Sequence, residues 1–417
     1  MNNFPTWLDE DLAQSLLRKM TVENNNLINN ESGYFVYHLD KLKHHLAMLQ
    51  QQNVVKLWYA VKANPLSDII RVLDQQGFNF DVASVGELHQ VLAQDITPQR
   101  ILNTGPAKSK KQLQYFLQQG VNTFVIESLN QLKWLNECAV NLNKQPTVLL
   151  RVQLQWPKGE KNPLGGNSLT PFGLATEEWA KISLSDYPML NICGLHIFQW
   201  GNMLSNEKMY SLWSQMVPPL ISLAKTLKMK FKILDLGGGL GLDYIEQNQQ
   251  LSWQKIISDL NQIKAKTGVS ELWLELGRYA VGECGYYVTE IVDKKTNFHE
   301  PQLVLAAGIN HIIRPAITEQ PFPVTALRDN DKKYAITRNK KYHLYGPLCT
   351  SLDKLGTLTL PDNIKIGEQL IFAYCGAYGF SESMPFFLCH NIAAEYVFAK
   401  GKLQQVRAPQ AAHQYLR

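Results

Sequence analysis

The sequence predicts an α/β protein in which a (β/α)8 barrel of the TIM type is followed by a β domain. Up to about Gly282, short apolar runs alternate with amphipathic stretches of helical length. Beyond that point helical periods become rare, and strand-like segments separated by turn residues take their place. A chain of 417 residues is also too long for one compact core, so two domains are expected.

Eight apolar runs are the expected barrel strands: Val54–Ala60, Phe78–Ala83, Arg100–Asn103, Thr123–Ile126, Thr147–Val152, Ile192–Ile197, Lys232–Leu236 and Leu272–Leu276. The stretches expected as helices between them include Ser67–Gln76, Gly86–Ala93, Ser109–Gln119, Ser128–Asn141, Met209–Lys228 and Trp253–Lys266. Because strands and helices alternate throughout, the strands should be parallel and close into a barrel. A doubly wound open sheet is the alternative that this pattern leaves open.

Domain limits follow from the change of pattern. The barrel is placed at residues 35–281, and the β domain at residues 282–417 together with residues 1–34. The strands expected in the β domain are Tyr286–Asp293, Gln302–Ala307, Lys341–Tyr345 and Gln369–Ala373. Before the barrel we expect a helix at Asp9–Lys19 and a strand at Tyr34–Leu39, which is available to pair with the β domain.

Composition and charge exclude several classes of protein. Hydrophobic residues make up 45% of the chain and charged residues 18%, which is the composition of a globular protein. The formal charge of +5 comes from 41 basic and 36 acidic residues spread along the chain, without the basic cluster that nucleic-acid binding requires. No apolar run reaches the roughly 18 residues of a membrane span, and the start of the chain lacks the pattern of a secretory signal.

The six cysteines are widely spaced and form no Cys-x-x-Cys pair. Neither a zinc site nor a disulfide scaffold is therefore expected, and free thiols fit a reducing compartment. We expect a cytoplasmic protein without a metal, whose partner is a small molecule rather than a nucleic acid or a membrane.

The residues that close each expected strand are the ones to examine, because barrel enzymes carry their chemistry at the C-terminal ends of the strands. Lys62 follows the first run, within Tyr59–Pro65. A lysine in this position is usually a surface residue whose stem lies along apolar neighbours. The functional alternative is a Schiff-base lysine, because a partly desolvated amine loses its proton more readily and can attack an aldehyde.

Three glycines, at 237–239, follow the seventh run, and they allow backbone N–H groups to approach an anion closely. The third glycine of a dinucleotide fingerprint would fall at Leu242, and no Gly-Lys-Ser/Thr follows for a nucleotide P-loop. A phosphate group on a different ligand fits this spacing. A tight turn with no ligand is the alternative.

Two further strand ends carry charged or titratable groups. Glu275 and Arg278 close the eighth run, where an ordinary surface ion pair is the simplest interpretation. His196 closes the sixth run inside an apolar stretch, where a core histidine is the common outcome.

In this order and at these strand ends, the motifs resemble those of the fold-type III decarboxylases that depend on pyridoxal 5′-phosphate (PLP). This is the family of the diaminopimelate, ornithine and arginine decarboxylases. The segments that carry the resemblance are Tyr59–Pro65, Phe80–Glu87, Gly194–His196, Gly237–Gly241, Glu275–Arg278, Gly346–Asp353 and Gly376–Gly379. The resemblance covers nearly the whole chain, and it implies an alanine racemase-like barrel with a C-terminal β-barrel or β-sandwich domain.

The resemblance also implies roles in the barrel. Lys62 would carry PLP through its amine, His196 would stack on the cofactor ring, and Glu275 would pair with the pyridine nitrogen. The residues implied for the phosphate are Gly238, Gly239, Gly277 and Arg278. Alanine racemases place an arginine against the pyridine nitrogen. A carboxylate keeps that nitrogen protonated and makes the ring a stronger electron sink, which favours decarboxylation.

Residues around the amine and in the β domain complete the implied site. Asp81, Glu87 and Arg151 would surround the lysine. Cys349 would come from the β domain of a second subunit as the acid that protonates the product, whereas a free cysteine is more commonly a small buried apolar residue. Tyr378 would contact cofactor and substrate. A site shared in this way implies a homodimer.

Two motifs depart from the family pattern. The serine that helps to bind phosphate after the histidine is replaced, and Gln199 stands near its position. The family's Lys-Phe-Gly is here Pro171–Gly173, at the end of a long stretch, 155–173.

The substrate pocket departs as well. Diaminopimelate and ornithine decarboxylases place an acid after the cysteine for the distal ammonium of the substrate, and here Thr350 follows Cys349. Arg314 is retained, in Arg-Pro-Ala-Ile-Thr. A neutral residue beside an arginine suits a substrate whose distal end is amidated or anionic, and Lys158 or Lys161 would add to the attraction. The implied substrate-binding residues are Arg278, Arg314, Thr350, Asp353 and Tyr378.

Among relatives, these features resemble the decarboxylases of carboxylate-siderophore pathways, which act on citryl-diamino-acid conjugates. They share the run from Glu275 to Glu290 and a Leu-Cys-Thr followed by Gly-Ala-Tyr-Gly. Two alternatives stay open: a diaminopimelate decarboxylase of lysine biosynthesis, and a non-catalytic PLP-binding or regulatory homologue. The presence of Lys62 and Cys349 argues against the second, because a binding protein needs no proton donor.

Overall fold

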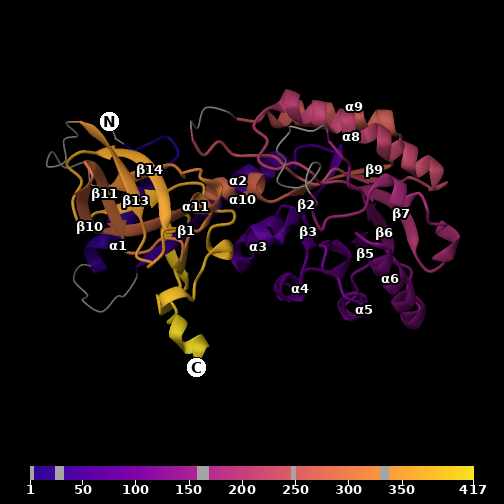
Figure 1. Cartoon of the computed structure of the whole chain (residues 1–417), viewed down its shortest axis with the longest axis horizontal. Coiled ribbons are helices and arrows are strands. Elements are labelled where there is room, and N and C mark those ends of the chain that lie inside the picture. Colours follow the sequence, from indigo (N-terminus) through magenta and orange to yellow (C-terminus); the bar gives the residue numbers. More distant parts are fainter. Residues whose placement is uncertain (1–3, 24–31, 157–168, 246–249, 329–337) are drawn as a thin grey trace. The chain divides into compact units, whose positions relative to one another are not determined.

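The computed structural model describes residues 4–23, 32–156, 169–245, 250–328 and 338–417 (Figure 1). The chain divides into two compact units. One contains Met1–His44, Tyr244–Gln247 and Val281–Arg417, and the other contains His45–Asp243 and Asn248–Ala280. The boundary that the sequence suggested after residue 34 falls inside strand β1 (Gly33–His38), which lies wholly in the first unit because it pairs there with β10 and β16.

The second unit is a closed barrel of eight parallel strands (Figure 1). Their bounds are β2 Val55–Ala60, β3 Asn79–Val82, β4 Ile101–Asn103, β5 Thr123–Ile126, β6 Thr147–Arg151, β7 Asn191–His196, β8 Ile233–Asp235 and β9 Glu271–Leu276. Strand β9 pairs with β2, which closes the ring. The eight expected runs are thus confirmed, and the open-sheet alternative is wrong.

One apolar layer fills the barrel interior. It is made by Trp58, Leu102, Val125, Leu149, Cys193, Ile233 and Trp273, each from a different strand. The two indole rings lie 4.8 Å apart between centroids, on the paired strands β2 and β9. On β7 only glycine fits at 194, because a Cβ there would stand 2.7 Å from the Leu149 side chain. This closely packed layer supports the side chains at the strand ends.

Helices follow the strands around the barrel (Figure 1). They are α3 Ser67–Gln75, α4 Val85–Leu92, α5 Lys110–Gln118, α6 Leu129–Leu142, α7 Thr176–Trp179, α8 Asn206–Thr226, α9 Trp253–Thr267 and α10 Arg278–Val281. Serines fix five of the starts, because the side chain of Ser84, Ser109, Ser128, Ser205 or Ser252 accepts the N–H three residues on. The four-residue α7 was not expected from the sequence, since it is too short to show a period.

The first unit contains a nine-stranded mixed sheet. Besides β1, its strands are β10 Gly285–Asn297, β11 Glu300–Leu305, β12 Val324–Leu327, β13 Asn339–Tyr345, β14 Lys354–Pro361, β15 Gln369–Phe372, β16 Ala394–Ala399 and β17 Lys402–Arg407. The order is β14-β13-β11-β10-β1-β16-β17, and β15 pairs with β10 and β12. The expected pairing of the strand at Tyr34–Leu39 with this domain is confirmed.

Helix α1 (Glu10–Glu23) supplies part of the core of this unit. Leu12 and Leu16 are fully buried in the same apolar cluster as Val36 and Val288 of the sheet. Helices α2 (Leu39–Leu49) and α11 (Arg314–Thr318) complete the list of α-helices among the described residues. No helix in the described ranges is both long and apolar enough to cross a lipid bilayer.

Candidate active site

The C-terminal ends of four barrel strands bring titratable side chains together around Lys62. Asp81 lies in β3, His196 and Asp235 end β7 and β8, and Glu275 lies one residue before the end of β9. Lys62 follows β2 in a 3-10 turn, Val61–Ala63, and its side chain is exposed. The amine is therefore accessible, while the four strand-end residues are buried.

Lys62 has carboxylates for neighbours. Burial, and then the negative charge of Glu275, raise the pKa of Asp81 well above its ordinary value, and Lys62 partly offsets this rise. The Thr104 hydroxyl also donates to Asp81 Oδ1 at 2.5 Å. On the other side, Ala83 N donates to Glu87 Oε2 at 2.6 Å. Burial raises the pKa of Glu87, and Lys62 lowers it.

His196, Asp235 and Glu275 form a compact group whose donor atoms lie within 4.8 Å of one another. The closest pair is His196 Nε2 and Glu275 Oε1, at 3.3 Å. Burial alone would raise the pKa of Glu275, but its interactions with His196 and then Lys62 hold it below the ordinary value. Burial and the charge of Glu275 raise the pKa of Asp235 well above its ordinary value.

Four buried polar atoms of this group have no hydrogen-bond partner among the described residues: His196 Nδ1, His196 Nε2, Glu275 Oε1 and Asp235 Oδ2. Buried polar atoms without partners are uncommon and indicate a polar ligand that completes the site. Imidazole and carboxylate groups also bind metals. The lysine and the glycine loop beside them instead suit an aldehyde that carries a phosphate.

The glycine loop after β8 has no room for side chains. Gly237 and Gly239 have positive φ angles of 62° and 102°. A Cβ on Gly238 would stand 2.1 Å from the carbonyl oxygen of Glu275. Asp235 Oδ1 accepts the N–H of Gly237 at 2.8 Å, and Glu275 N donates to the carbonyl of Gly237 at 2.7 Å. The loop is thus tied to β9, and its close backbone is suited to an anion.

Arg151, at the end of β6, belongs to a second, buried charge cluster. Its Nη1 donates to Glu127 Oε1 at 3.1 Å, and Lys108 Nζ lies 3.7 Å from the same oxygen. The side chains of Lys108 and Glu127 are 0% and 1% exposed. Burial lowers the pKa of Lys108 to about 8.

The two departures in the barrel motifs have structural explanations. Gln199 is buried; its Oε1 accepts Leu154 N at 2.9 Å, and its Nε2 donates to Leu154 O at 2.7 Å. Its amide therefore holds the backbone after β6, at Leu154. Gly173 donates its N–H to Glu127 Oε2 at 3.2 Å. Lys158 and Lys161 lie outside the described residues.

Two of the expected substrate-binding residues lie together in the first unit. Arg314 Nη1 donates to both carboxylate oxygens of Glu382, at 2.9 and 2.6 Å, and its guanidinium lies 4.6 Å from the centroid of the Tyr378 ring. The positive charge of Arg314 is thus already paired. Any anionic ligand has to share this arginine with Glu382 or displace that carboxylate.

Asp353 has a different role from the expected contact with substrate. Its carboxylate accepts the N–H groups of Ile309 and Leu348, each at 2.8 Å, and the residue is 2% exposed. The carboxylate therefore shapes the loop that carries Cys349 and is not available to a ligand. Cys349 is exposed, so the interpretation as a small buried apolar residue is wrong, and Thr350 beside it is half-buried.

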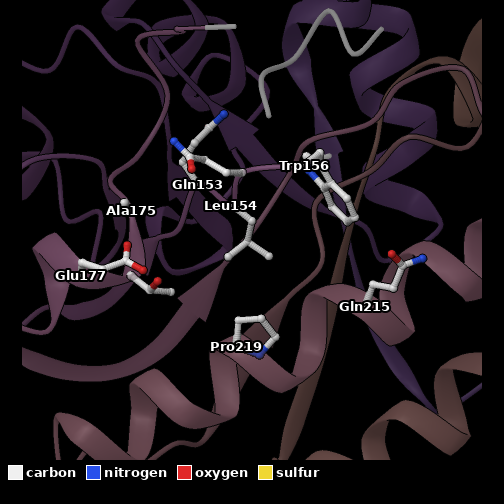
Figure 2. Close-up of a pocket in the computed structure, with 9 residues that line it drawn as sticks. Gln153, Leu154, Trp156, Ala175, Glu177, Gln215 and Pro219 are labelled. Carbon is white, nitrogen blue, oxygen red and sulfur yellow. The ribbon is translucent and has the colours of Figure 1, made fainter. Parts of the chain in front are cut away.

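The barrel unit contains a cavity of about 540 Å³ (Figure 2). Residues 153–156 after β6, residues 175–177 at α7, and Gln215 and Pro219 of α8 line it. Pro219 has no N–H to donate to the carbonyl oxygen of Gln215, so that carbonyl lacks the usual hydrogen bond within the helix. None of the residues expected to bind cofactor or substrate lines this cavity.

The accessible lysine, the buried carboxylates and the glycine loop at one end of the barrel define an enzyme site built for PLP. The family model of the pyridoxal-dependent decarboxylases, pyridoxal binding domain, matches residues 39–282. The chain belongs to this family. It is a PLP-dependent decarboxylase, a carboxy-lyase that acts on an amino-acid-type small molecule.

Individual relatives agree with this assignment. The chain is 28% identical over 369 residues to 2-[(L-alanin-3-ylcarbamoyl)methyl]-2-hydroxybutanedioate decarboxylase of Staphylococcus aureus, covering 86% of this chain and 92% of the relative. It is 28% identical over 355 residues to diaminopimelate decarboxylase of Aquifex aeolicus, covering 84% and 82%. The crystal structure of diaminopimelate decarboxylase from Helicobacter pylori complexed with L-lysine shares the fold, with a TM-score of 0.82, 20% identity and coverage of 94% and 98%.

Five residues of the two units were missed by sequence reasoning: Thr104, Lys108, Glu127, Asp235 and Glu382. Glu127 and Asp235 stand at the ends of β5 and β8, so the strand-end rule applied to every strand would have singled them out. Lys108 lies in the connection between β4 and α5, and Glu382 ends a 3-10 helix, Phe380–Glu382; neither belongs to a motif that the sequence singled out.

Replacing the buried Lys108 by methionine should change how stability depends on pH. Below about pH 8 this lysine is protonated in both the folded and the unfolded chain, so its burial destabilises the fold. From about pH 8 to its ordinary value of 10.5 the folded chain gives up the proton first, and stability rises with pH. At about 1.4 kcal/mol per pH unit, the wild type should gain up to about 3 kcal/mol relative to Lys108→Met across this window.

Thermal unfolding of the two cofactor-free proteins from neutral pH to about pH 10.5 measures this difference, because the other titrating groups are common to both. Parallel pH profiles would show that Lys108 titrates normally.

Proposed function

We propose that this decarboxylase acts on a conjugate in which a short diamino acid is joined by an amide to a carboxylate-rich group of the citryl type, as in carboxylate-siderophore biosynthesis. The observation that carries the proposal is the neutral Thr350 next to the exposed Cys349. An acid at this position would pair with a free distal ammonium and would repel a carboxylate. The printed name of the Staphylococcus aureus relative describes a substrate of this kind, a hydroxybutanedioate joined through a carbamoyl group to an alanin-3-yl group.

The residues of the barrel have separate tasks in this proposal. PLP, when bound, stabilises the negative charge that remains on Cα as CO₂ leaves. Lys62 would bind the cofactor through its amine, and Glu275 would accept a hydrogen bond from its pyridine nitrogen. His196 would lie against the ring. The backbone of Gly238 and Gly239, together with Gly277 and Arg278, would hold the phosphate.

A second copy of the chain completes the site in this proposal. Cys349, exposed on its own unit, would deliver a proton to Cα in the site of the partner subunit, with Tyr378 beside it. An exposed apolar run, Met384 and Phe386–Leu388, follows Tyr378 closely in the chain. Exposed apolar surface of this kind is typical of an interface, and a two-fold homodimer has two equivalent sites. All six cysteines are free, which supports a reducing cytoplasmic location.

Arg314 contributes less to substrate choice than its charge suggests. Because Glu382 accepts two hydrogen bonds from it, the pair has no net charge. In this proposal Thr350 allows a carboxylate-rich distal group because it has no negative charge, and Arg314 adds little attraction because Glu382 already pairs with it. The second candidate function is the decarboxylation of diaminopimelate, which the Aquifex aeolicus relative favours by its name.

The purified protein should be yellow from cofactor bound to Lys62, because this amine is accessible and surrounded by the site. Borohydride should fix PLP to the peptide that contains Lys62, and mass spectrometry of the digested protein detects it. Lys62→Ala should bind PLP without a fixable bond, and Lys108→Met serves as the matched lysine control that keeps it. Finding the label on any other lysine would contradict the assignment.

Mixing inactive Lys62→Ala with inactive Cys349→Ala should restore activity if sites are shared between subunits. About half of the randomly exchanged dimers are mixed, and each has one intact site of two, so roughly a quarter of wild-type activity is expected. CO₂ release is measured after subunit exchange has been verified by native mass spectrometry. No recovery would place both residues in the site of one chain or make the cysteine dispensable.

Thr350→Glu should remove most of the substrate preference. We expect wild type to favour citryl-diaminopropionate or citryl-ornithine over ornithine, lysine and diaminopimelate by at least about tenfold in kcat/KM, or about 1.4 kcal/mol. The glutamate variant should lose most of this preference because its charge repels the citryl end. Thr350→Gln is the control with the same bulk and no charge, and it should keep the preference. Equal use of free diaminopimelate by wild type would support the second candidate function.

A further inference from the structure

Glu127 is at the centre of the buried charge cluster that it forms with Arg151 and Lys108. It follows β5, and both of its carboxylate oxygens are occupied: Oε1 by Arg151 and Lys108, and Oε2 by the N–H of Gly173 at 3.2 Å. Its own N–H donates to Oε1 of Gln131 at 3.0 Å, so the backbone is also fixed. A carboxylate held at so many points is a rigid anchor for the guanidinium that it binds.

Arg151 is constrained on a second side. Its guanidinium lies 4.6 Å from the centroid of the Phe172 ring, and its carbonyl oxygen accepts Leu174 N at 3.1 Å and Trp179 Nε1 at 2.8 Å. Gly173 makes this packing possible, because it has a φ of 65° and a Cβ there would stand 2.7 Å from the Arg151 carbonyl oxygen. Carboxylate and aromatic ring together fix where the positive charge of Arg151 lies.

The alternative acceptor for this guanidinium is Glu275. The register pairs Arg151 with His196 on the neighbouring strand β7, and His196 Nε2 lies 3.3 Å from Glu275 Oε1, so the arginine lies next to this group of acids. Its positive charge adds to the effects of His196 and Lys62 that hold the pKa of Glu275 below the ordinary value. Glu275 Oε1 is buried without a hydrogen-bond partner in the described part of the chain. Arginine forms strong paired hydrogen bonds with a carboxylate of this kind. A guanidinium hydrogen-bonded to Glu275 would compete for its oxygens and lower the pKa of the carboxyl, which would make it a weaker acceptor for the pyridine nitrogen.

We propose that Glu127 is a positioning residue that holds the Arg151 guanidinium toward β5 and so keeps Glu275 free for the pyridine nitrogen of PLP. Lys108 and Phe172 support this placement from either side. The inference rests on the role of Glu275 given under the proposed function. It assigns to Glu127 an effect on the protonation of the cofactor without any contact with it.

The test measures whether the pyridine nitrogen of bound PLP is protonated. Holoenzyme reconstituted with PLP labelled with ¹⁵N at that position should give the signal of a protonated nitrogen in wild type. Glu127→Gln keeps the shape of the side chain and removes its charge. It should move the signal toward the unprotonated position and lower kcat about tenfold, with KM changed less than about twofold, since binding contacts are kept. Glu127→Asp, which keeps the charge, should retain most of the wild-type signal.

Removing the competing cation should cancel the effect. The double variant Glu127→Gln/Arg151→Met should show the same protonated signal and the same kcat as Arg151→Met alone, because Glu127 then has no guanidinium to hold. Should Glu127→Gln fail to fold, Phe172→Leu removes the other constraint and should shift the signal in the same direction by a smaller amount. A merely structural role for Glu127 would lower thermal stability while the nitrogen signal stays in place, and it would give additive losses in the double variant. An unchanged nitrogen signal in Glu127→Gln, or additive losses in the double variant, overturns the inference. An unprotonated nitrogen in wild type would instead refute the role of Glu275 itself.

Discussion

Closure of the barrel between β2 and β9 is the constraint on which the site depends. The register pairs Trp58 with Glu275 and Tyr59 with Leu276, so the turn that carries Lys62 ends beside the carboxylate of β9. These residues come from opposite ends of the barrel sequence, and only a closed ring makes them neighbours. The apolar layer, with Trp58 against Trp273, helps to keep this register in place.

In the resulting site, the buried charged side chains form separate small groups. Glu275 lies with His196, Glu127 with Arg151 and Lys108, and Asp81 with the hydroxyl of Thr104. Each pairing reduces the cost of removing a charge from water, and each leaves a defined set of atoms for a ligand. His196 Nδ1 and Asp235 Oδ2 are buried, lie outside these pairs and have no hydrogen-bond partner among the described residues.

The strands of the barrel could be predicted because buried parallel strands are continuous apolar runs, and each run ends where the chain reaches the polar mouth. The β domain was harder to predict from sequence. Strand β16 is a short apolar segment and β17 is a polar one, and neither has the alternation that marks a half-buried strand. Among the candidate site residues, those in recognisable motifs were singled out from the sequence. Glu127 was missed because its partners come from elsewhere in the chain: Arg151 ends β6 and Lys108 lies between β4 and α5, so only the fold brings them together.

Asp353 shows the limit of motif-based reasoning in another way. The sequence does not show whether an acidic side chain in a loop faces a ligand or its own backbone. Here two backbone N–H groups donate to the Asp353 carboxylate. Gln199 is similar, since its amide is used by the backbone of Leu154. In both positions the sequence predicted that the residue mattered, and the hydrogen bonds decide what it does.

The two lysines near the strand ends illustrate how a protein selects one amine among many. A lysine that loses its proton near pH 8 is chemically the better trap for carbonyl compounds, and Lys108 is such a residue. Its side chain is completely enclosed, however, whereas that of Lys62 is open. Enclosure therefore keeps Lys108 from reacting with an aldehyde even where it has lost its proton. The same enclosure would protect Lys108 from reactive sugars and other aldehydes that modify exposed amines.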